Sequence, residues 1–264
     1  MTAHVARKRF GQHFLHDPGV INRIVRAIDP RPDQQLIEIG PGLGALTLPL
    51  LERTGKLQVI ELDRDVIPRL QEACGNHPGL SIVQADVLDV DFSTFAGPGM
   101  KLRVVGNLPY NISTPLLFHL LEHAAVIEDM HFMLQKEVVQ RICAAPDSEH
   151  YGRLSVTLFA RAESVSLFHV GAGAFNPPPR VESAVVRLRP RPVPFPINDL
   201  PTFDRVVREA FNHRRKTLSN ALKGVCEPHH FAGASVNPKA RAETLSAEQF
   251  ARLANGLYSE PGSD

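Results

Sequence analysis

Four consecutive residues, Asn107, Leu108, Pro109 and Tyr110, combine groups that could hold a nucleobase for chemistry. The Asn107 side-chain oxygen and the Leu108 backbone carbonyl can both accept hydrogen bonds from one exocyclic amino group, and the Tyr110 ring offers a stacking face. The lone pair of an adenine or cytosine amine is delocalised into the ring, and two such acceptors would concentrate it on nitrogen. These residues therefore indicate a site that alkylates a base amine, although they also suit an ordinary turn after a strand.

The residues before this motif place it at the edge of a sheet. Val104 and Val105 are typical of a buried parallel strand, and Pro109 cannot donate to a strand ladder, so the chain must leave the sheet there. Ligands of open α/β sheets bind at the carboxyl ends of the strands. We therefore expect Asn107 and Tyr110 to lie at a ligand-binding edge.

A glycine-rich turn at 40–44 follows an earlier expected strand at 36–39. Glycines such as Gly40 permit positive φ and close backbone approach, and the next helix offers its N-terminal NH groups to a ligand. Dinucleotide-binding folds use a similar turn, so the turn alone is a weak signal. Glu38, inside the strand, is unsuited to a pyrophosphate and suits a ligand with a cationic end.

Acidic residues follow the next two expected strands, at 57–61 and 80–85. Glu61 can accept hydrogen bonds from both hydroxyls of a ribose, whereas Asp63 is better suited to capping the following helix. Asp86 can accept from an adenine amino group. A glycine turn with acids at successive strand ends describes a pocket for a nucleoside with a positive tail. S-adenosylmethionine fits that description better than NAD or a flavin.

Phe175 begins a proline-rich loop that continues to Arg180, between expected strands at 165–170 and 181–188. Three consecutive prolines make such a loop stiff. Phe175 could therefore stack on the second face of a base held against Tyr110. The alternative is that its ring only closes the end of the hydrophobic core.

The composition is ordinary for a globular protein: 264 residues, of which 43% are hydrophobic and 22% are charged. No apolar run approaches the ~20 residues that span a bilayer, and no signal-peptide core follows the basic start. The three cysteines are too scattered for a disulfide framework or a zinc site. We therefore expect a cytoplasmic monomer without a metal ion.

Pro49 and Pro68 fall inside expected helices. Each proline would destabilise its helix by about 3 kcal/mol unless the helix kinks or begins late.

The domain organisation follows from a stiff linker. Residues 1–190 are expected to form an α/β domain preceded by a basic N-terminal arm, 191–200 a proline-rich linker, and 201–264 a small helical domain. The net charge is only +1, so a nucleic-acid partner would be bound by local basic patches. The candidate phosphate contacts, which could equally be solvated surface, are Arg7, Lys8, Arg9, Arg214, Arg215 and Lys216.

Taken together, five segments resemble those of the ribosomal RNA adenine dimethyltransferases of the KsgA (RsmA) type. They occur in the family's order at 7–15, 38–44, 107–110, 175–181 and 214–218. The resemblance covers nearly the whole chain. It implies an α/β fold: a Rossmann-like class I methyltransferase domain, with a mostly parallel seven-stranded sheet ending in an antiparallel hairpin, plus a C-terminal all-α domain that binds RNA.

The resemblance also implies an activity. The family transfers four methyl groups from S-adenosylmethionine to N6 of two adjacent adenosines in the 3′-terminal hairpin loop of 16S rRNA, within the small subunit or its precursor. The cofactor contacts it implies are His13, Leu15, Gly40, Glu61, Asp86 and Asn107. Many members have Asn at the place of His13, which leaves the role of that side chain open.

Two other functions stay open at this point. The first is the related antibiotic-resistance methyltransferase of 23S rRNA, against which Leu108 and the segment 214–218 argue. The second is a non-catalytic factor that assists ribosome assembly, and it does not exclude the methyltransferase. In the methyltransferase reading, Tyr110 and Phe175 sandwich an adenine that is splayed out of the RNA loop, and no general base is needed for the transfer.

Overall fold

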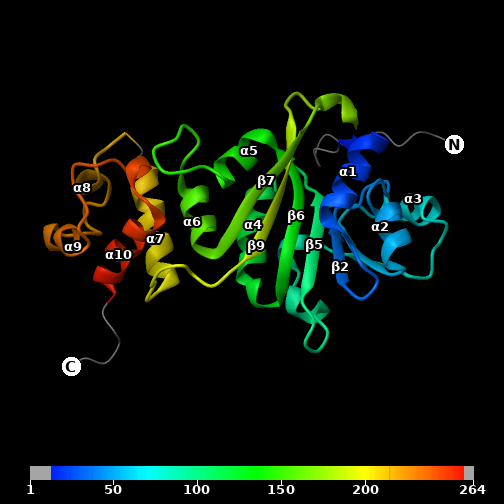
Figure 1. The fold of residues 1–264 in the computed structure, drawn as a ribbon, viewed down its shortest axis with the longest axis horizontal. Coiled ribbons are helices and arrows are strands. Elements are labelled where there is room, and N and C mark those ends of the chain that lie inside the picture. Colours follow the sequence, from blue (N-terminus) through cyan, green and yellow to red (C-terminus); the bar gives the residue numbers. More distant parts are fainter. Residues whose placement is uncertain (1–12, 214, 259–264) are drawn as a thin grey trace. The chain divides into compact units, whose positions relative to one another are not determined.

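The computed structural model describes residues 13–213 and 215–258, which fall into two compact units (Figure 1). The first contains the residues up to Val139 together with Val165–Pro190, and the second contains Gln140–Ser164 together with the residues from Arg191 onward. The units divide after Pro190, where the proline-rich linker was expected. Residues 140–164 belong with the helical unit rather than with the sheet, which the sequence did not indicate.

A mixed sheet forms the framework of the first unit. Among the described residues, seven strands pair in the order β4-β3-β2-β5-β6-β9-β7. All neighbours from β4 to β6 are parallel and β9 is antiparallel to β6, which confirms the predicted mostly parallel sheet. The carboxyl ends of five strands therefore meet at one edge. The strands are β2 (Gln35–Ile39), β3 (Leu57–Glu61), β4 (Leu80–Gln84), β5 (Leu102–Asn107), β6 (Ile127–Gln135), β7 (Ala162–Val170) and β9 (Ser183–Pro190).

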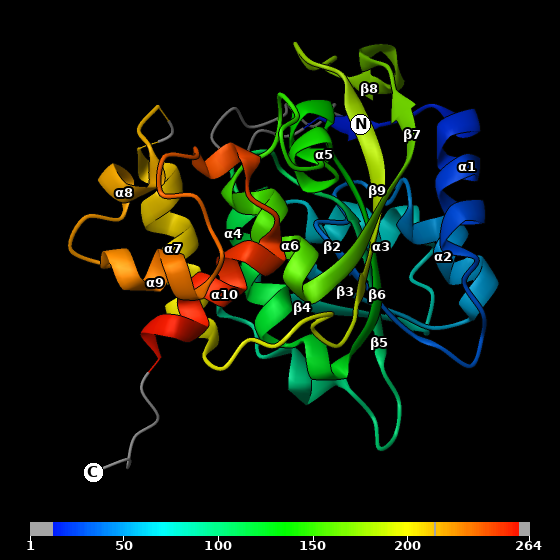
Figure 2. The same cartoon turned by 60° about the vertical axis from the view of Figure 1, so that its left-hand side comes forward.

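Helices cover the sheet on both faces (Figure 2). Helix α1 begins as expected, with Pro18 at its first position and the Asp17 side chain accepting a hydrogen bond from the Val20 NH. The buried faces of α1, α2 and α3 share one hydrophobic cluster with β2, β3 and β5, whereas α4 lies on the opposite face. The helices are α1 (Pro18–Ile28), α2 (Thr47–Thr54), α3 (Ile67–Ala73), α4 (Ser113–Glu122) and α5 (Lys136–Ile142).

The two prolines within expected helices lie in first turns. Pro49 is the third residue of α2, and Pro68 is the second residue of α3. The first NH groups of a helix have no partner within the helix, so a proline there removes no hydrogen bond. Both helices begin late enough to avoid the expected cost.

A buried ion pair joins two strands at the opposite edge of the sheet. Arg103 on β5 and Asp129 on β6 form a bidentate pair in which both N···O distances are 2.9 Å. The guanidinium also donates to the Ile28 carbonyl and to the Gln34 side chain, so it connects the end of α1 to the sheet. Both charged side chains are almost fully buried, which makes the pair costly to break.

His131 lies beside this pair and stays neutral. Burial lowers the pKa of His131 to about 4; Asp129 acts against this decrease and Arg103 adds to it. Between pH 6.5 and pH 4 the unfolded chain therefore binds a proton that the folded chain does not. We expect stability to fall with decreasing pH in this window, by about 1.4 kcal/mol per pH unit from this group. Urea unfolding at pH 5 and pH 7 should show a smaller pH dependence for His131→Gln; equal dependences would contradict this assignment.

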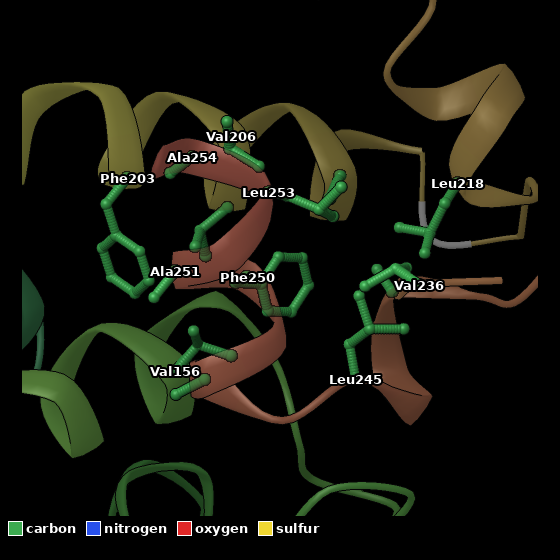
Figure 3. Packing of buried hydrophobic residues seen from close by; sticks show 14 of the residues in the cluster. Val156, Phe203, Val206, Leu218, Val236, Leu245, Phe250, Ala251, Leu253 and Ala254 are labelled. Atoms are coloured by element: carbon green, nitrogen blue, oxygen red, sulfur yellow. The ribbon is translucent and has the colours of Figure 1, made fainter. Parts of the chain in front are cut away.

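The second unit is helical and has its own core (Figure 3). Phe203 and Val206 of α7 pack with Phe250 and Leu253 of α10 and with Val156 of α6. The contribution of α6 explains why residues 140–164 belong to this unit. Its helices are α6 (Arg153–Arg161), α7 (Leu200–Asn212), α8 (Leu218–Ala221), α9 (Pro228–Gly233) and α10 (Ala247–Leu257).

The last helix begins with the capping box that the sequence predicts. The Ser246 hydroxyl accepts from the Gln249 NH at 3.2 Å, and the Gln249 side chain accepts from the Ser246 NH at 2.9 Å.

Candidate active site

A pocket lies at the carboxyl edge of the parallel strands, entirely within the first unit. Its lining includes residues from the ends of four neighbouring strands, which is the predicted position for a ligand. The structure thus brings together most of the residues that the sequence singled out. These are His13, Leu15, Gly40, Glu61, Asp86, Asn107, Leu108, Pro109 and Tyr110.

The glycine-rich turn forms one wall of the pocket. Gly40 and Gly42 have φ angles of 62° and 54°, in the left-handed region that favours glycine. The Gly42 NH donates to Glu61 Oε2 at 3.3 Å, which ties the turn to the end of β3. Backbone atoms are therefore held close to the space where a ligand would lie.

Glu61 and Asp86, the two acids that the sequence proposed for a ligand, line the side formed by β3 and β4, and Asp63 lines it as well. Glu61 accepts hydrogen bonds from the NH groups of Gly42 and Asp63, and burial raises the pKa of its carboxyl. Asp86 is more exposed and accepts from the Leu88 NH at 3.0 Å. A carboxylate has about four acceptor positions, so both acids retain positions that can accept from hydroxyl or amino groups of a ligand.

The lining also contains Glu38, an acid within β2. Glu38 is 2% exposed, and its Oε2 atom has no hydrogen-bond partner. Burial raises the pKa of Glu38 to about 8; the Thr47 side chain acts in the opposite direction, and Glu61 adds to the increase. Among the described residues, no lysine or arginine lines the pocket. The lining therefore fits a nucleoside with a positive tail and does not fit a pyrophosphate.

Asn107 is oriented by its own amide nitrogen. The Asn107 Nδ2 group donates to the His13 carbonyl at 3.3 Å, which leaves the side-chain oxygen as the free acceptor. The Leu108 NH donates to the Met133 carbonyl at 3.2 Å, so the start of the loop is fixed to β6. These bonds hold in place the two oxygens that the sequence proposed for an exocyclic amine.

Tyr110 is held by two contacts that the sequence did not predict. Its hydroxyl lies 2.9 Å from Ser183 Oγ on β9. Its ring stacks with the ring of His13, with centroids 5.9 Å apart and planes 29° from parallel. The His13 Nδ1–H group donates to the Pro177 carbonyl at 2.8 Å, because that carbonyl can only accept. The role of Ser183 could not be predicted from the sequence, because its neighbours indicate only a buried strand.

Phe175 is the candidate stacking residue that the structure places in the hydrophobic core. Its side chain is 2% exposed, belongs to the hydrophobic core and does not line the pocket. The cause is the short ribbon between β1 (Phe14–Leu15) and β8 (Phe175–Asn176), in which Phe175 pairs with Leu15. In this structure Phe175 therefore closes the core, as the alternative describes, and the stacking of its ring on the second face of a base stays a prediction.

The comparisons with known proteins agree with this geometry. The family model described as "Ribosomal RNA adenine dimethylase" matches residues 3–258. The chain belongs to this family. It is 59% identical to the "Ribosomal RNA small subunit methyltransferase A" of Xanthomonas oryzae pv. oryzae (strain PXO99A), over 95% of each chain.

Two solved structures extend the likeness to the fold of this family. A dimethyladenosine transferase from Plasmodium falciparum is 25% identical with a TM-score of 0.74, over 91% of this chain and 96% of the other. The 23S rRNA methyltransferase ErmE is 28% identical with a TM-score of 0.69, and the match covers 92% of this chain and 99% of ErmE. The predicted Rossmann-like methyltransferase fold is thereby confirmed.

The residues proposed for RNA contacts are only partly described. Arg7, Lys8, Arg9 and Arg214 lie outside the described residues. Arg215 and Lys216 are exposed, just before α8.

No helix in the described part of the chain is long and apolar enough to cross a membrane. No cluster of three or more potential metal ligands occurs among the described residues.

Proposed function

We propose that this protein dimethylates N6 of two adjacent adenosines in the 3′-terminal hairpin loop of 16S rRNA, with S-adenosylmethionine as the methyl donor. The observation that carries the proposal is the oriented amide of Asn107, whose free oxygen shares one pocket with the Tyr110 ring and the acids Glu61 and Asp86. An acceptor for an amine, a stacking face and a nucleoside site thus meet at one edge of the sheet.

The order of the strands supports one orientation of the methyl donor in the pocket. From β4 through β3 and β2 to β5, the pocket presents Asp86, Glu61, Glu38 and Asn107. Asp86 suits an adenine amine and Glu61 suits ribose hydroxyls, so these two acids would hold the adenosine part. When bound, S-adenosylmethionine supplies an electrophilic methyl carbon, and Asn107 lies at the end of the series where the accepting amine is needed.

The chain's own residues act by positioning. In the first transfer the Asn107 oxygen and the Leu108 carbonyl accept the two N6 hydrogens and direct the nitrogen lone pair out of the ring plane, while Tyr110 stacks on the base. Such orientation can supply most of the rate enhancement of a direct displacement. The amine becomes acidic only after it has gained the methyl group, so the transfer step needs no general base. In the second transfer N6 has one hydrogen left for these acceptors, and each transfer releases one proton to solvent.

Basic residues would bind the RNA phosphates. We expect neutral substitutions at Arg215 and Lys216 to make the negative slope of log K against log salt concentration shallower, by about 0.7 to 0.9 for each lost contact. RNA affinity measured across a salt series checks this. Substitutions at Arg7, Lys8, Arg9 and Arg214 should act in the same direction, and an unchanged slope would identify any of these side chains as solvated surface.

The choice of ribosomal subunit separates this proposal from the large-subunit alternative. Identity to the relative named for the small subunit is about twice the identity to the large-subunit enzyme, over similar lengths. Unmethylated small and large subunits can be incubated separately with the protein and radiolabelled S-adenosylmethionine. Label in 16S rRNA is expected, and label in 23S rRNA would contradict the proposal.

The proposal includes a role in small-subunit biogenesis, performed by a cytoplasmic monomer. A purely non-catalytic assembly factor would bind small-subunit precursors without turnover of the donor, and the same labelling experiment would then give no label in either RNA.

A further inference from the structure

The acid within β2 has properties that positioning of the adenosine does not require. Glu38 is buried, and one of its oxygens lacks any hydrogen-bond partner. An unpaired buried carboxylate is costly, and burial raises the pKa of Glu38 to about 8. Glu38 therefore carries a proton at neutral pH as long as no cation lies beside it.

The sheet register places Glu38 beside the junction of donor and acceptor. Glu38 pairs with Val59 of β3 and Val105 of β5, and Glu61 and Asn107 lie two residues further along these strands. Residues two apart in a strand point to the same face, so the three polar side chains share one face. In the donor, the sulfonium sulfur is bonded both to the ribose carbon and to the methyl group. With the ribose at Glu61 and the methyl group at Asn107, the sulfur would lie between β3 and β5, on the side of β2 that carries Glu38.

The groups that face Glu38 offer no compensating positive charge. Thr47 of α2 is a neutral neighbour that lowers the pKa of Glu38, and the titratable neighbours are Glu61 on β3 and Cys74 after α3. Burial, with a contribution from Glu38, raises the pKa of the Cys74 thiol. The part of the lining that the structure describes contains no lysine or arginine. A positively charged ligand is then the partner that would stabilise the ionised form of Glu38.

We propose that Glu38 distinguishes the methyl donor from the product by ionising when a sulfonium lies beside it; the inference rests on the proposed function. The Glu38 carboxylic acid gives one proton to solvent, and the carboxylate then neutralises the charge on sulfur. After methyl transfer the sulfur is an uncharged thioether, and Glu38 takes up a proton from solvent. The attraction between the Glu38 carboxylate and the sulfonium is therefore absent once the methyl group has been transferred. The pocket then binds S-adenosylhomocysteine more weakly than S-adenosylmethionine, which favours release of the product.

Calorimetry on the full chain tests this inference without turnover. Titrations at pH 7 in buffers of different ionisation enthalpy should show release of about one proton with S-adenosylmethionine, and its affinity should rise about tenfold per pH unit below pH 8. S-adenosylhomocysteine has the same amino acid tail, so the smaller release expected with it isolates the sulfonium. Equal release with both ligands, or none with S-adenosylmethionine, would overturn the inference while the proposed function stood. Failure of S-adenosylmethionine to bind at all would overturn both.

A matched pair of variants gives a second test. Glu38→Gln keeps the shape of the protonated acid, so it should bind S-adenosylhomocysteine as wild type does. It should bind S-adenosylmethionine at least tenfold more weakly and release no proton. Glu52→Gln, at an exposed acid of α2, should retain the wild-type preference and proton release. Retention of both by Glu38→Gln would overturn the inference.

Protein stability provides a third readout. The contribution of Glu38 to stability is fully present below its ordinary pKa of 4.5 and is lost as pH rises through about 8. Glu38→Gln should therefore unfold at a higher temperature than wild type at pH 8, in the absence of ligand. An unchanged or lower midpoint would show that Glu38 is not held as a buried acid, and would overturn the inference.

Discussion

Replacing Asn107 by alanine is expected to lower turnover of S-adenosylmethionine by on the order of a hundredfold, while RNA affinity changes little. The reason is that the Asn107 oxygen is one of the two acceptors proposed to draw the N6 lone pair toward the donor. The amide itself is oriented by its bond to the His13 carbonyl, so the substitution removes an acceptor that is already in place. Single-turnover kinetics and an RNA-binding titration measure the two effects separately.

The neighbouring Asn111 provides a matched control. Asn111 is exposed in the same loop and lines the same pocket, but none of the hydrogen bonds found in the described structure orients its side chain. Asn111→Ala should therefore change turnover by no more than a few fold. Equal losses of turnover and RNA binding in Asn107→Ala would show that Asn107 contributes to general binding rather than to alignment of the amine.

The largest expected effect on stability comes from the buried ion pair. Asp129→Asn leaves the Arg103 guanidinium buried without its counter-charge, and breaking such a pair in this way costs about 3 to 5 kcal/mol. The loss should appear in the free energy of unfolding from urea denaturation. The paired substitution Arg103→Met with Asp129→Leu removes both charges, so it should recover most of that loss.

An exposed ion pair serves as the comparison. Glu248 and Arg252 lie one helical turn apart on α10, with 3.1 Å between their charged atoms. Glu248→Gln should cost less than about 0.5 kcal/mol, because solvent screens both charges. If Asp129→Asn cost no more than Glu248→Gln, the buried pair would not connect α1 to the sheet in the way described.

Local signals made much of the fold readable from the sequence. The start of α1 depends on Asp17 and Pro18, and the start of α10 depends on Ser246 and Gln249, all within a few residues of the elements they define. The pocket was predictable for a topological reason. Parallel strands bring their carboxyl ends to one edge, so residues that follow successive strands must be neighbours there.

Features that depend on distant pairing were not readable. Phe175 is buried because β8 pairs with β1, and nothing near Phe175 in the sequence indicates that partner. The contact between Tyr110 and Ser183 joins the loop after β5 to the start of β9, which is far away along the chain. The sequence did mark Glu38 as an acid suited to a cationic ligand. The burial of Glu38, with one carboxyl oxygen lacking a hydrogen-bond partner, is a property of packing that only the three-dimensional structure shows.

The central claim is that the pocket presents the N6 amine of adenine to a methyl donor. The most direct measurement is mass spectrometry of nucleosides and RNA fragments after small subunits lacking the modification are incubated with the protein and isotopically labelled S-adenosylmethionine. The account predicts four labelled methyl groups, as N6,N6-dimethyladenosine at two adjacent positions in the 3′-terminal hairpin loop of 16S rRNA. Label on any other atom or nucleotide, or an RNA that remains unlabelled, would contradict it.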